Sequence, residues 1–106
     1  TGIDIACPEG TPVPASNSGK VVFSGDVITT GKTVVIEHGA GLKTYYFHLS
    51  ELSCRTGDLV EKGREIGKVG STGYSTGPHL HFEVMIGEYS LNPWVLFDGT
   101  SRIYSK

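Results

Sequence analysis

The sequence has little of the material that builds long helices or crosses a membrane. It contains one methionine and few leucines and alanines, whereas 15 of its 106 residues are glycine, about twice the share expected from an average usage of about 7%. It has no run of about 18 apolar residues, so no segment of this chain is predicted to span a membrane as a helix. The β-branched and aromatic runs favour an all-β domain with many turns.

The sequence also lacks an excess of positive charge. Its formal net charge is −2 at pH 7, so we expect no nucleic-acid partner and no attraction to anionic lipid. No signal peptide is recognisable at its start. We expect the chain to be a mature or excised piece of a longer protein, with any targeting segment upstream of Thr1.

Cysteine is scarce, because only Cys7 and Cys54 occur, and they do not have the spacing of a zinc knuckle. One interpretation is a single disulfide in an oxidising compartment. The other, which we favour, is a pair of partly buried thiols that fill positions where Ala or Val would also fit, since Cys is among the most buried residue types.

Runs of β-branched and aromatic residues between turn residues predict a series of short strands. These are residues 13–15, 20–25, 32–38, 43–49 and, as the last clear strand, 79–86. The tight connection at 39–41 predicts a hairpin between 32–38 and 43–49. Frequent glycine in 57–70 excludes a helix, because each glycine costs about 1 kcal/mol in a helix interior. This segment is instead predicted to form short strands around a sharp turn. The tail is expected to pack through Trp94, Leu96 and Phe97.

Two histidines, His79 and His81, follow a Gly/Ser/Thr loop and the pair Gly77-Pro78. Residues i and i+2 of a strand point to the same face, so both imidazoles can reach one point in space. An H-x-H pair alone is only moderately specific, since chance pairs are common. Its setting, with Phe82-Glu83 directly after it, favours a metal ligand with a catalytic partner beside it.

Asp4 and His48 complete the candidate site. A catalytic zinc keeps three protein ligands of the N, O or S type and a water whose pKa falls to about 7. Asp4 and His81 are predicted as two such ligands, and a further imidazole would complete the set. His48 and His79 are then predicted to be catalytic, one taking a proton from water and the other stabilising charge on a carbonyl oxygen.

Each of these residues also has a purely structural interpretation. A lone histidine in a β domain is most often at the surface, or in the core with its hydrogen bonds satisfied, and we expect this of His38 beside Gly39. Asp4 alone is uninformative, because Asp is common in loops. What favours the functional interpretation is the combination of motifs around the H-x-H pair.

Taken together, these motifs resemble those of the lysostaphin/LytM-type zinc endopeptidases, which cleave peptide cross-bridges in bacterial cell walls. The resemblance covers nearly the whole chain, and the combination of motifs is far more specific than any one of them. The motifs are GIDIA (2–6), EGTPVPA (9–15), GKVV (19–22), VVIEHG (34–39), YFHLS (46–50), GDLVEKG (57–63) and GSTGYSTGPHLHFE (70–83).

The resemblance implies an all-β, antiparallel barrel-sandwich hybrid with a groove across the sheet. It also implies that residues 1–106 are a single LytM-type peptidase domain acting on peptidoglycan peptides with zinc as cofactor. The implied location is extracellular or in the cell envelope of a bacterium, because the substrate lies there.

The resemblance also implies a role for each candidate residue. In the family, zinc is bound by an aspartate, by a histidine four residues before it, and by the second histidine of H-x-H. The aspartate corresponds to Asp4 and the H-x-H ligand to His81, while the remaining histidine would fall immediately before Thr1. The domain is therefore expected to lack its N-terminal edge, including that ligand. His79 and His48 correspond to the catalytic pair.

The same resemblance places Tyr46 and Tyr74 near the substrate groove. The loops at 26–31 and 71–77 would border that groove. Which peptide bond the groove would select does not follow from the sequence.

Two interpretations of the function remain open. One is a zinc-dependent endopeptidase that hydrolyses peptide cross-bridges of peptidoglycan. The other is a non-catalytic binding or regulatory module of the same fold, in a cell-wall, division or sporulation complex with a protein partner. This second interpretation is considered because the metal-binding histidine expected immediately before Thr1 is not part of this sequence. A carrier domain, suggested by the glycine-rich turns of 57–70, is weaker, because no lysine stands in the setting that such carriers modify.

Overall fold

The computed structural model describes residues 2–75 and 77–91, which form strands and turns with no helix among them. The strands are β1 (Gly2–Ala6), β2 (Pro12–Pro14), β3 (Gly19–Val27), β4 (Gly31–Gly39), β5 (Leu42–Leu52), β6 (Leu59–Val60), β7 (Glu65–Val69), β8 (His79–Ile86) and β9 (Tyr89–Leu91). Across the described ranges, no helical stretch has the length and apolar character to cross a membrane. The predicted packing of Trp94, Leu96 and Phe97 lies outside the described residues.

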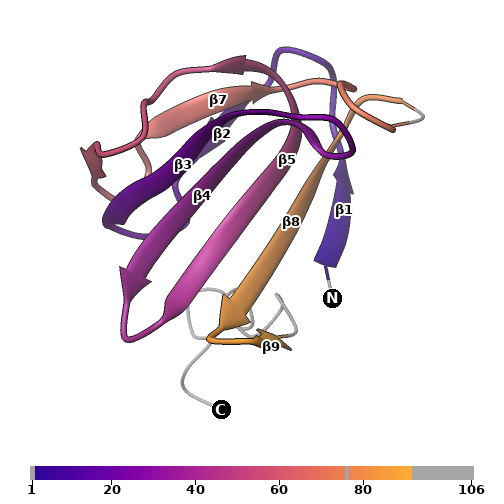
Figure 1. Ribbon diagram of the computed structural model, residues 1–106. Coiled ribbons are helices and arrows are strands. Elements are labelled where there is room, and N and C mark those ends of the chain that lie inside the picture. Colours follow the sequence, from indigo (N-terminus) through magenta and orange to yellow (C-terminus); the bar gives the residue numbers. More distant parts are fainter. Residues whose placement is uncertain (1, 76, 92–106) are drawn as a thin grey trace.

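The strands form one antiparallel sheet that does not close into a barrel. Its main path runs in the order β1-β8-β5-β4-β3-β6, and β2 pairs with β7 beside it (Figure 1). Strand β5 joins the two parts, because residues 42–47 pair with β8 and residues 49–52 pair with β7. The predicted all-β, antiparallel barrel-sandwich fold is therefore confirmed.

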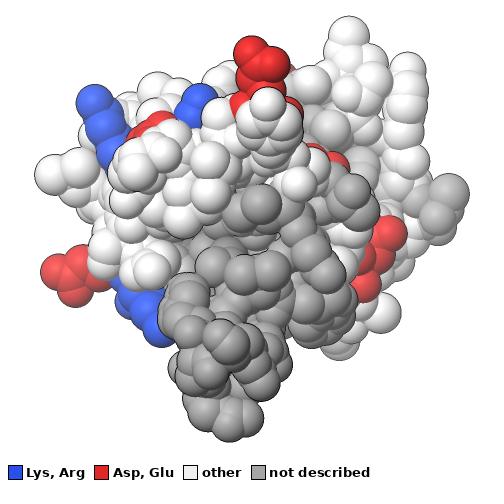
Figure 2. Space-filling view, turned by 90° about the horizontal axis from the view of Figure 1, so that it is seen from below, with Lys and Arg blue, Asp and Glu red and all other residues white. Residues whose placement is uncertain are grey.

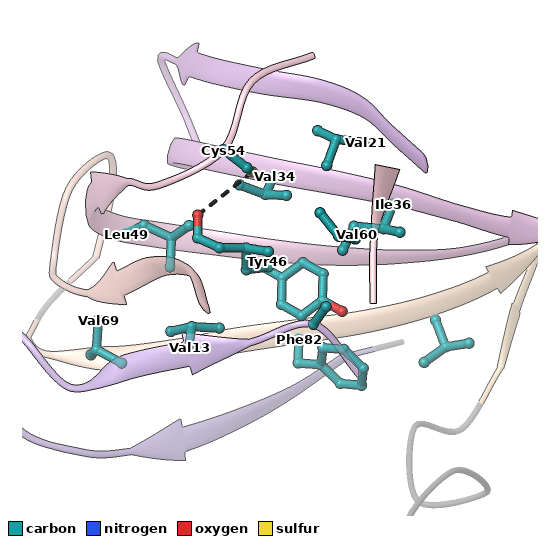
Figure 3. Close-up of a cluster of buried hydrophobic side chains, with 13 residues drawn as sticks. Val13, Val21, Val34, Ile36, Tyr46, Leu49, Cys54, Val60, Val69 and Phe82 are labelled. Carbon is teal, nitrogen blue, oxygen red and sulfur yellow. Dashed lines mark hydrogen bonds between the residues drawn. The ribbon is translucent and has the colours of Figure 1, made fainter. Parts of the chain in front are cut away.

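The core lies on one face of the central strands. Alternate residues of β4 and β5 point into it, so Val34, Ile36, Thr44 and Tyr46 are at most 1% exposed. Figure 3 shows the Tyr46 ring beside Phe82, and the two ring centroids are 5.3 Å apart. Because each fully buried apolar side chain contributes about 1.5–3 kcal/mol, this cluster holds the sheet rigid beneath its opposite face.

The predicted strands are present, and β4 and β5 form the predicted hairpin through residues 40–41. Two strands were missing from the sequence-based prediction. Strand β1 is a short edge strand with mostly exposed side chains. Ile3 and Ile5 alternate with Asp4, but two apolar residues are too few to indicate a strand. Strand β9 follows the turn at Gly87, so residues 79–86 are not the last strand.

Both cysteines are free thiols, which confirms the interpretation as packing residues rather than a disulfide. Cys54 is buried, and its sulfur lies 3.6 Å from the Ile66 carbonyl oxygen. Burial raises the pKa of the Cys54 thiol, which keeps it in the unreactive protonated form at neutral pH.

Charged side chains of both signs occur on the face shown in Figure 2, and the described part of that face shows no continuous basic patch. Ion pairs join Lys32 to Asp26 and Lys68 to Glu65 at the surface. Such exposed pairs contribute little to stability, because water and salt screen them.

Candidate functional site

The candidate site lies where β1, β8 and β5 run side by side (Figure 1). Strand β1 is antiparallel to β8 with Asp4 opposite His81. The Nδ1 atom of His81 donates to Asp4 Oδ1 at 2.6 Å, and His79 Nε2 lies 3.3 Å from the same oxygen. The sheet thus brings together side chains that are up to 77 positions apart in sequence.

Gly2 allows this close approach of β1 to β8. It pairs with Glu83, and a Cβ atom at Gly2 would overlap the ring of His81 and lie 2.6 Å from Glu83 Cγ. Any larger residue would therefore displace either β1 or the side chains of His81 and Glu83.

His48 reaches the same face through an irregularity in β5. Lys32 pairs with Leu49 and Val34 pairs with Tyr46, so Phe47 and His48 together oppose the single residue between Lys32 and Val34. Such a β-bulge changes the direction of the side chains after it. Strict alternation would put His48 on the core face with Tyr46, but the bulge places it on the opposite face, beside Phe47.

The bulge holds His48 in a backbone conformation that is unusual for a residue with a side chain. Its φ is 63°, in the left-handed region that glycine adopts easily and other residues rarely do. Its backbone N–H donates to the Thr30 carbonyl at 2.7 Å, which fixes the turn against the β3–β4 loop. Strain of this kind persists where the surrounding structure determines the conformation, and it concentrates at functional sites.

The strained backbone predicts that glycine is the more stable replacement at this position. Both His48→Gly and His48→Ala remove the imidazole, but only alanine keeps the Cβ atom that disfavours a positive φ. We expect the free energy of unfolding of His48→Gly to exceed that of His48→Ala by about 1 kcal/mol, measured by denaturant unfolding. At Lys43 of the same strand, which has no positive φ, glycine should instead be the less stable of the two. The same order at both positions would contradict the argument.

Backbone carbonyls determine which ring nitrogen carries the proton in two of the histidines. His48 Nδ1 lies 2.7 Å from the Thr72 oxygen, and His79 Nδ1 lies 2.8 Å from the Gly77 oxygen. A carbonyl can only accept, so each Nδ1 must be the donor. In the neutral rings, Nε2 is then left with its lone pair.

The three imidazoles form a compact group. The ring centroids of His48 and His79 are 5.3 Å apart, and those of His48 and His81 are 6.4 Å apart. Phe47 stacks on His81, with the planes 13° from parallel and the centroids 5.3 Å apart. An aromatic wall on one side therefore limits the orientations that the His81 ring can adopt.

Glu83 is a site residue that the sequence analysis did not identify. Its Oε2 accepts from His81 Nε2 at 3.0 Å, so His81 lies between two carboxylates, Asp4 and Glu83. Burial opposes the charged ring, but the hydrogen bonds to Asp4 and Glu83 outweigh it and raise the pKa of His81. The hydrogen bond from His81 in turn lowers the pKa of Asp4. The signal in the sequence was the i+2 spacing from His81, the same spacing that relates His79 to His81.

The prediction that Tyr46 lines the groove is wrong. Tyr46 is 1% exposed and points into the core (Figure 3), where its hydroxyl is 2.8 Å from Thr44 Oγ1 and 3.0 Å from Ser16 Oγ. Alternation along β5 puts Tyr45 and Phe47 on the site face and Tyr46 between them on the other. Tyr74 is exposed in the 71–77 loop, and its role in the groove stays a prediction.

His38 lies outside the candidate site, as expected. Its Nδ1 is 2.8 Å from the Ser18 carbonyl oxygen and its Nε2 is 2.7 Å from Thr44 Oγ1. Both ring nitrogens are therefore used in hydrogen bonds that hold β4 in place.

The donor atoms of Asp4 and His81 are of the oxygen and nitrogen type that zinc prefers. Glu83 behind His81 gives the carboxylate–histidine arrangement that commonly orients a metal-binding ring. No set of three or more His, Cys, Asp or Glu residues able to hold a metal is present within residues 2–75 and 77–91. The described residues thus fit zinc in their chemistry, with Asp4 and His81 as the two predicted donors. The roles of these two residues and the third ligand stay predictions.

Comparisons with known proteins identify the family of this chain. Residues 1–93 match the family described as Peptidase family M23. The DD-carboxypeptidase/endopeptidase Mpg of Neisseria meningitidis is 50% identical over 93 residues, which are 88% of this chain and 21% of that protein. The peptidoglycan DD-endopeptidase ShyB of Vibrio cholerae is 44% identical over 85 residues, 80% of this chain and 20% of that protein. The chain spans about a fifth of the length of these relatives.

Solved structures share the fold. A zinc-containing peptidase from Vibrio cholerae superimposes with a TM-score of 0.82 at 41% identity, covering 85% of this chain and 28% of that one. SpoIIQ, solved in a complex with SpoIIIAH, gives a structure match with a TM-score of 0.72 at 38% identity, covering 88% of this chain and 61% of the matched one. The family match over residues 1–93, with relatives of this similarity, shows that the chain belongs to peptidase family M23.

Proposed function

We propose that this domain belongs to a zinc-dependent endopeptidase that hydrolyses peptide cross-bridges of bacterial peptidoglycan. The observation that carries the proposal is the convergence of Asp4, His48, His79 and His81 on one face of the sheet. The similarity to a peptidoglycan DD-endopeptidase and to a zinc-containing peptidase supports it. Such a substrate implies an extracellular or cell-envelope location.

In this proposal Asp4 Oδ1 and His81 Nδ1 would hold the metal, together with a histidine expected immediately before Thr1. The Nδ1 atom would first release the proton that it donates to Asp4, because a metal-binding imidazole must be neutral. When bound, zinc supplies a Lewis acid for the scissile carbonyl and lowers the pKa of a water molecule. His48 and His79 act through Nε2, because each Nδ1 is committed to a backbone carbonyl. One Nε2 accepts a proton from water, and the other, when protonated, donates a hydrogen bond to the peptide oxygen.

The proposal is tested with the full-length protein and purified peptidoglycan. We expect release of peptide fragments that stops when a chelator is added and returns when zinc is restored. Folded, zinc-loaded protein that releases no fragments would overturn the proposal. Cleavage that is indifferent to the chelator would overturn the role of the metal.

Glu83 is proposed to hold the His81 ring with Nδ1 turned toward Asp4. We expect Glu83→Ala to weaken zinc binding by about 10–100-fold, as is typical for the partner of a metal-binding histidine. Glu83→Gln should weaken it less, because its amide oxygen still accepts from Nε2. Competition with a chromogenic chelator measures both affinities, and Glu61→Gln, an exposed position away from the site, is the control. Unchanged zinc affinity in Glu83→Ala would contradict the role.

The structural likeness to the SpoIIQ complex favours a second candidate, a non-catalytic module that binds a protein partner. The two candidates differ at the residue encoded immediately before Thr1. A histidine there favours the enzyme, whereas Ser, Asn or Arg favours the module. Determining that residue is the least demanding test that separates them.

A further inference from the structure

We propose that Thr72 is a positioning residue for His48, whose side-chain hydroxyl fixes the place of the carbonyl that holds the imidazole. The proposal rests on the proposed function, in which His48 acts on the substrate. Thr72 is in the loop between β7 and β8, 24 positions from His48 in sequence. Among the described residues, its side chain makes hydrogen bonds to the backbone of Lys32 and Leu49 rather than to Asp4, His79 or His81.

The hydroxyl of Thr72 bridges two strands beside the bulge. It accepts from the backbone N–H of Lys32 at 3.0 Å and donates to the carbonyl of Leu49 at 2.7 Å. Lys32 and Leu49 face each other across β4 and β5, immediately next to the bulge that contains His48. The hydroxyl therefore anchors the loop to the backbone segment that redirects the His48 side chain.

The carbonyl of the same residue accepts the hydrogen bond from His48 Nδ1 at 2.7 Å. The Thr72 hydroxyl and the Thr72 carbonyl are only a few covalent bonds apart, so a shift of the hydroxyl moves the carbonyl with it. The position of Thr72 thus determines both which tautomer of His48 is favoured and the direction in which its Nε2 points.

Close packing leaves this arrangement little freedom. A Cβ atom on Gly31 would overlap the hydroxyl of Thr72 and lie 2.7 Å from its carbonyl oxygen. A Cβ atom on Gly73 would lie 2.8 Å from the Thr29 carbonyl oxygen, which accepts the N–H of Tyr74 at 3.0 Å. Figure 1 shows the β3–β4 loop and the β7–β8 loop at the same end of the sheet, so both loops that were predicted to border the groove meet at Thr72.

Substitution of the hydroxyl tests the proposal in the full-length, zinc-loaded protein. Thr72→Val keeps the shape of the side chain but removes both hydrogen bonds, and it should lower kcat by about 10–10²-fold with KM nearly unchanged. In ¹⁵N-histidine NMR spectra, the His48 signals should change from the Nδ1–H form to a mixture of tautomers. Thr72→Ser keeps the hydroxyl and should restore both the rate and the spectrum. If valine cannot be accommodated, Thr72→Ala carries the same prediction.

Thr44→Val is the matched control. It also removes a hydrogen-bonded hydroxyl, but from β5 itself and on the core face, where Thr44 is buried and bonds Tyr46 and His38. We expect it to lower stability without altering kcat or the His48 spectrum.

The outcomes separate the two proposals. A wild-type protein that hydrolyses no peptidoglycan refutes the proposed function, while the His48 spectra still decide whether Thr72 positions the ring. A wild-type protein that is active, with a Thr72→Val variant of unchanged kcat or unchanged His48 signals, overturns the positioning role. So does a Thr72→Ser variant as impaired as the valine variant.

Discussion

His81→Ala in the full-length protein should abolish zinc binding and peptidoglycan hydrolysis together. The Nδ1 atom of His81 meets Asp4 Oδ1 at 2.6 Å, and these two atoms are the metal donors that we propose among the described residues. Loss of a residue that only orients a metal ligand typically lowers affinity by about 10–100-fold. Removing one of the ligands themselves should lower zinc affinity by more than this. Metal content after dialysis and hydrolysis of purified peptidoglycan measure the two losses.

His38→Ala is the control for this result. His38 is also fully hydrogen-bonded through both ring nitrogens, but it lies on β4 away from the site. It should retain zinc and activity even if it is somewhat less stable. A His81→Ala protein that keeps a full equivalent of zinc would refute the proposed ligand role.

His48→Ala should retain zinc and lose rate, with kcat lower by about 10²–10⁴-fold, the usual contribution of a general acid or base. The reason is geometric: His48 makes its side-chain hydrogen bond to the Thr72 carbonyl, and its ring is beside His79 rather than bonded to Asp4. Zinc content and steady-state kinetics, measured on the same preparation, separate the two effects. Loss of zinc from His48→Ala would show that the role is wrongly assigned.

His79→Ala is expected to behave similarly, but it is a less clean test. His79 Nε2 lies 3.3 Å from Asp4 Oδ1, so its removal changes the surroundings of a proposed metal ligand. Comparing the two variants shows how far the catalytic and metal-binding roles are separate. Equal zinc affinity in both would support their separation.

Regular backbone geometry explains what the sequence could predict. The period of two in a strand was sufficient to place His79 and His81 on one face, and the observed register extends that face to Glu83. The same rule applied to Glu83 would have identified it, since only its spacing from His81 was needed. The turn chemistry of residues 39–41 likewise sufficed for the β4–β5 hairpin.

Irregular geometry explains what it could not predict. The bulge at Phe47 and His48 breaks the alternation of β5, and no local pattern marks it, because histidine seldom adopts a positive φ. The motif that contains Tyr46 and His48 indicates a functional segment, but it does not show that only one of the two side chains faces the site. The resemblance alone therefore places Tyr46 near the groove, although its side chain lies in the core.

The pairing of β1 with β8 is the longest-range ladder described in this chain, since it joins residues 2–6 to residues 79–83. Contacts of such large sequence separation form late in folding, after the entropy of closing a long loop has been overcome. A partly synthesised or partly folded chain would accordingly hold Asp4 and His81 apart. Any hydrolytic capacity would arise only after the N-terminal strand had paired with β8, so the topology itself delays the onset of reactivity until this edge of the sheet has formed.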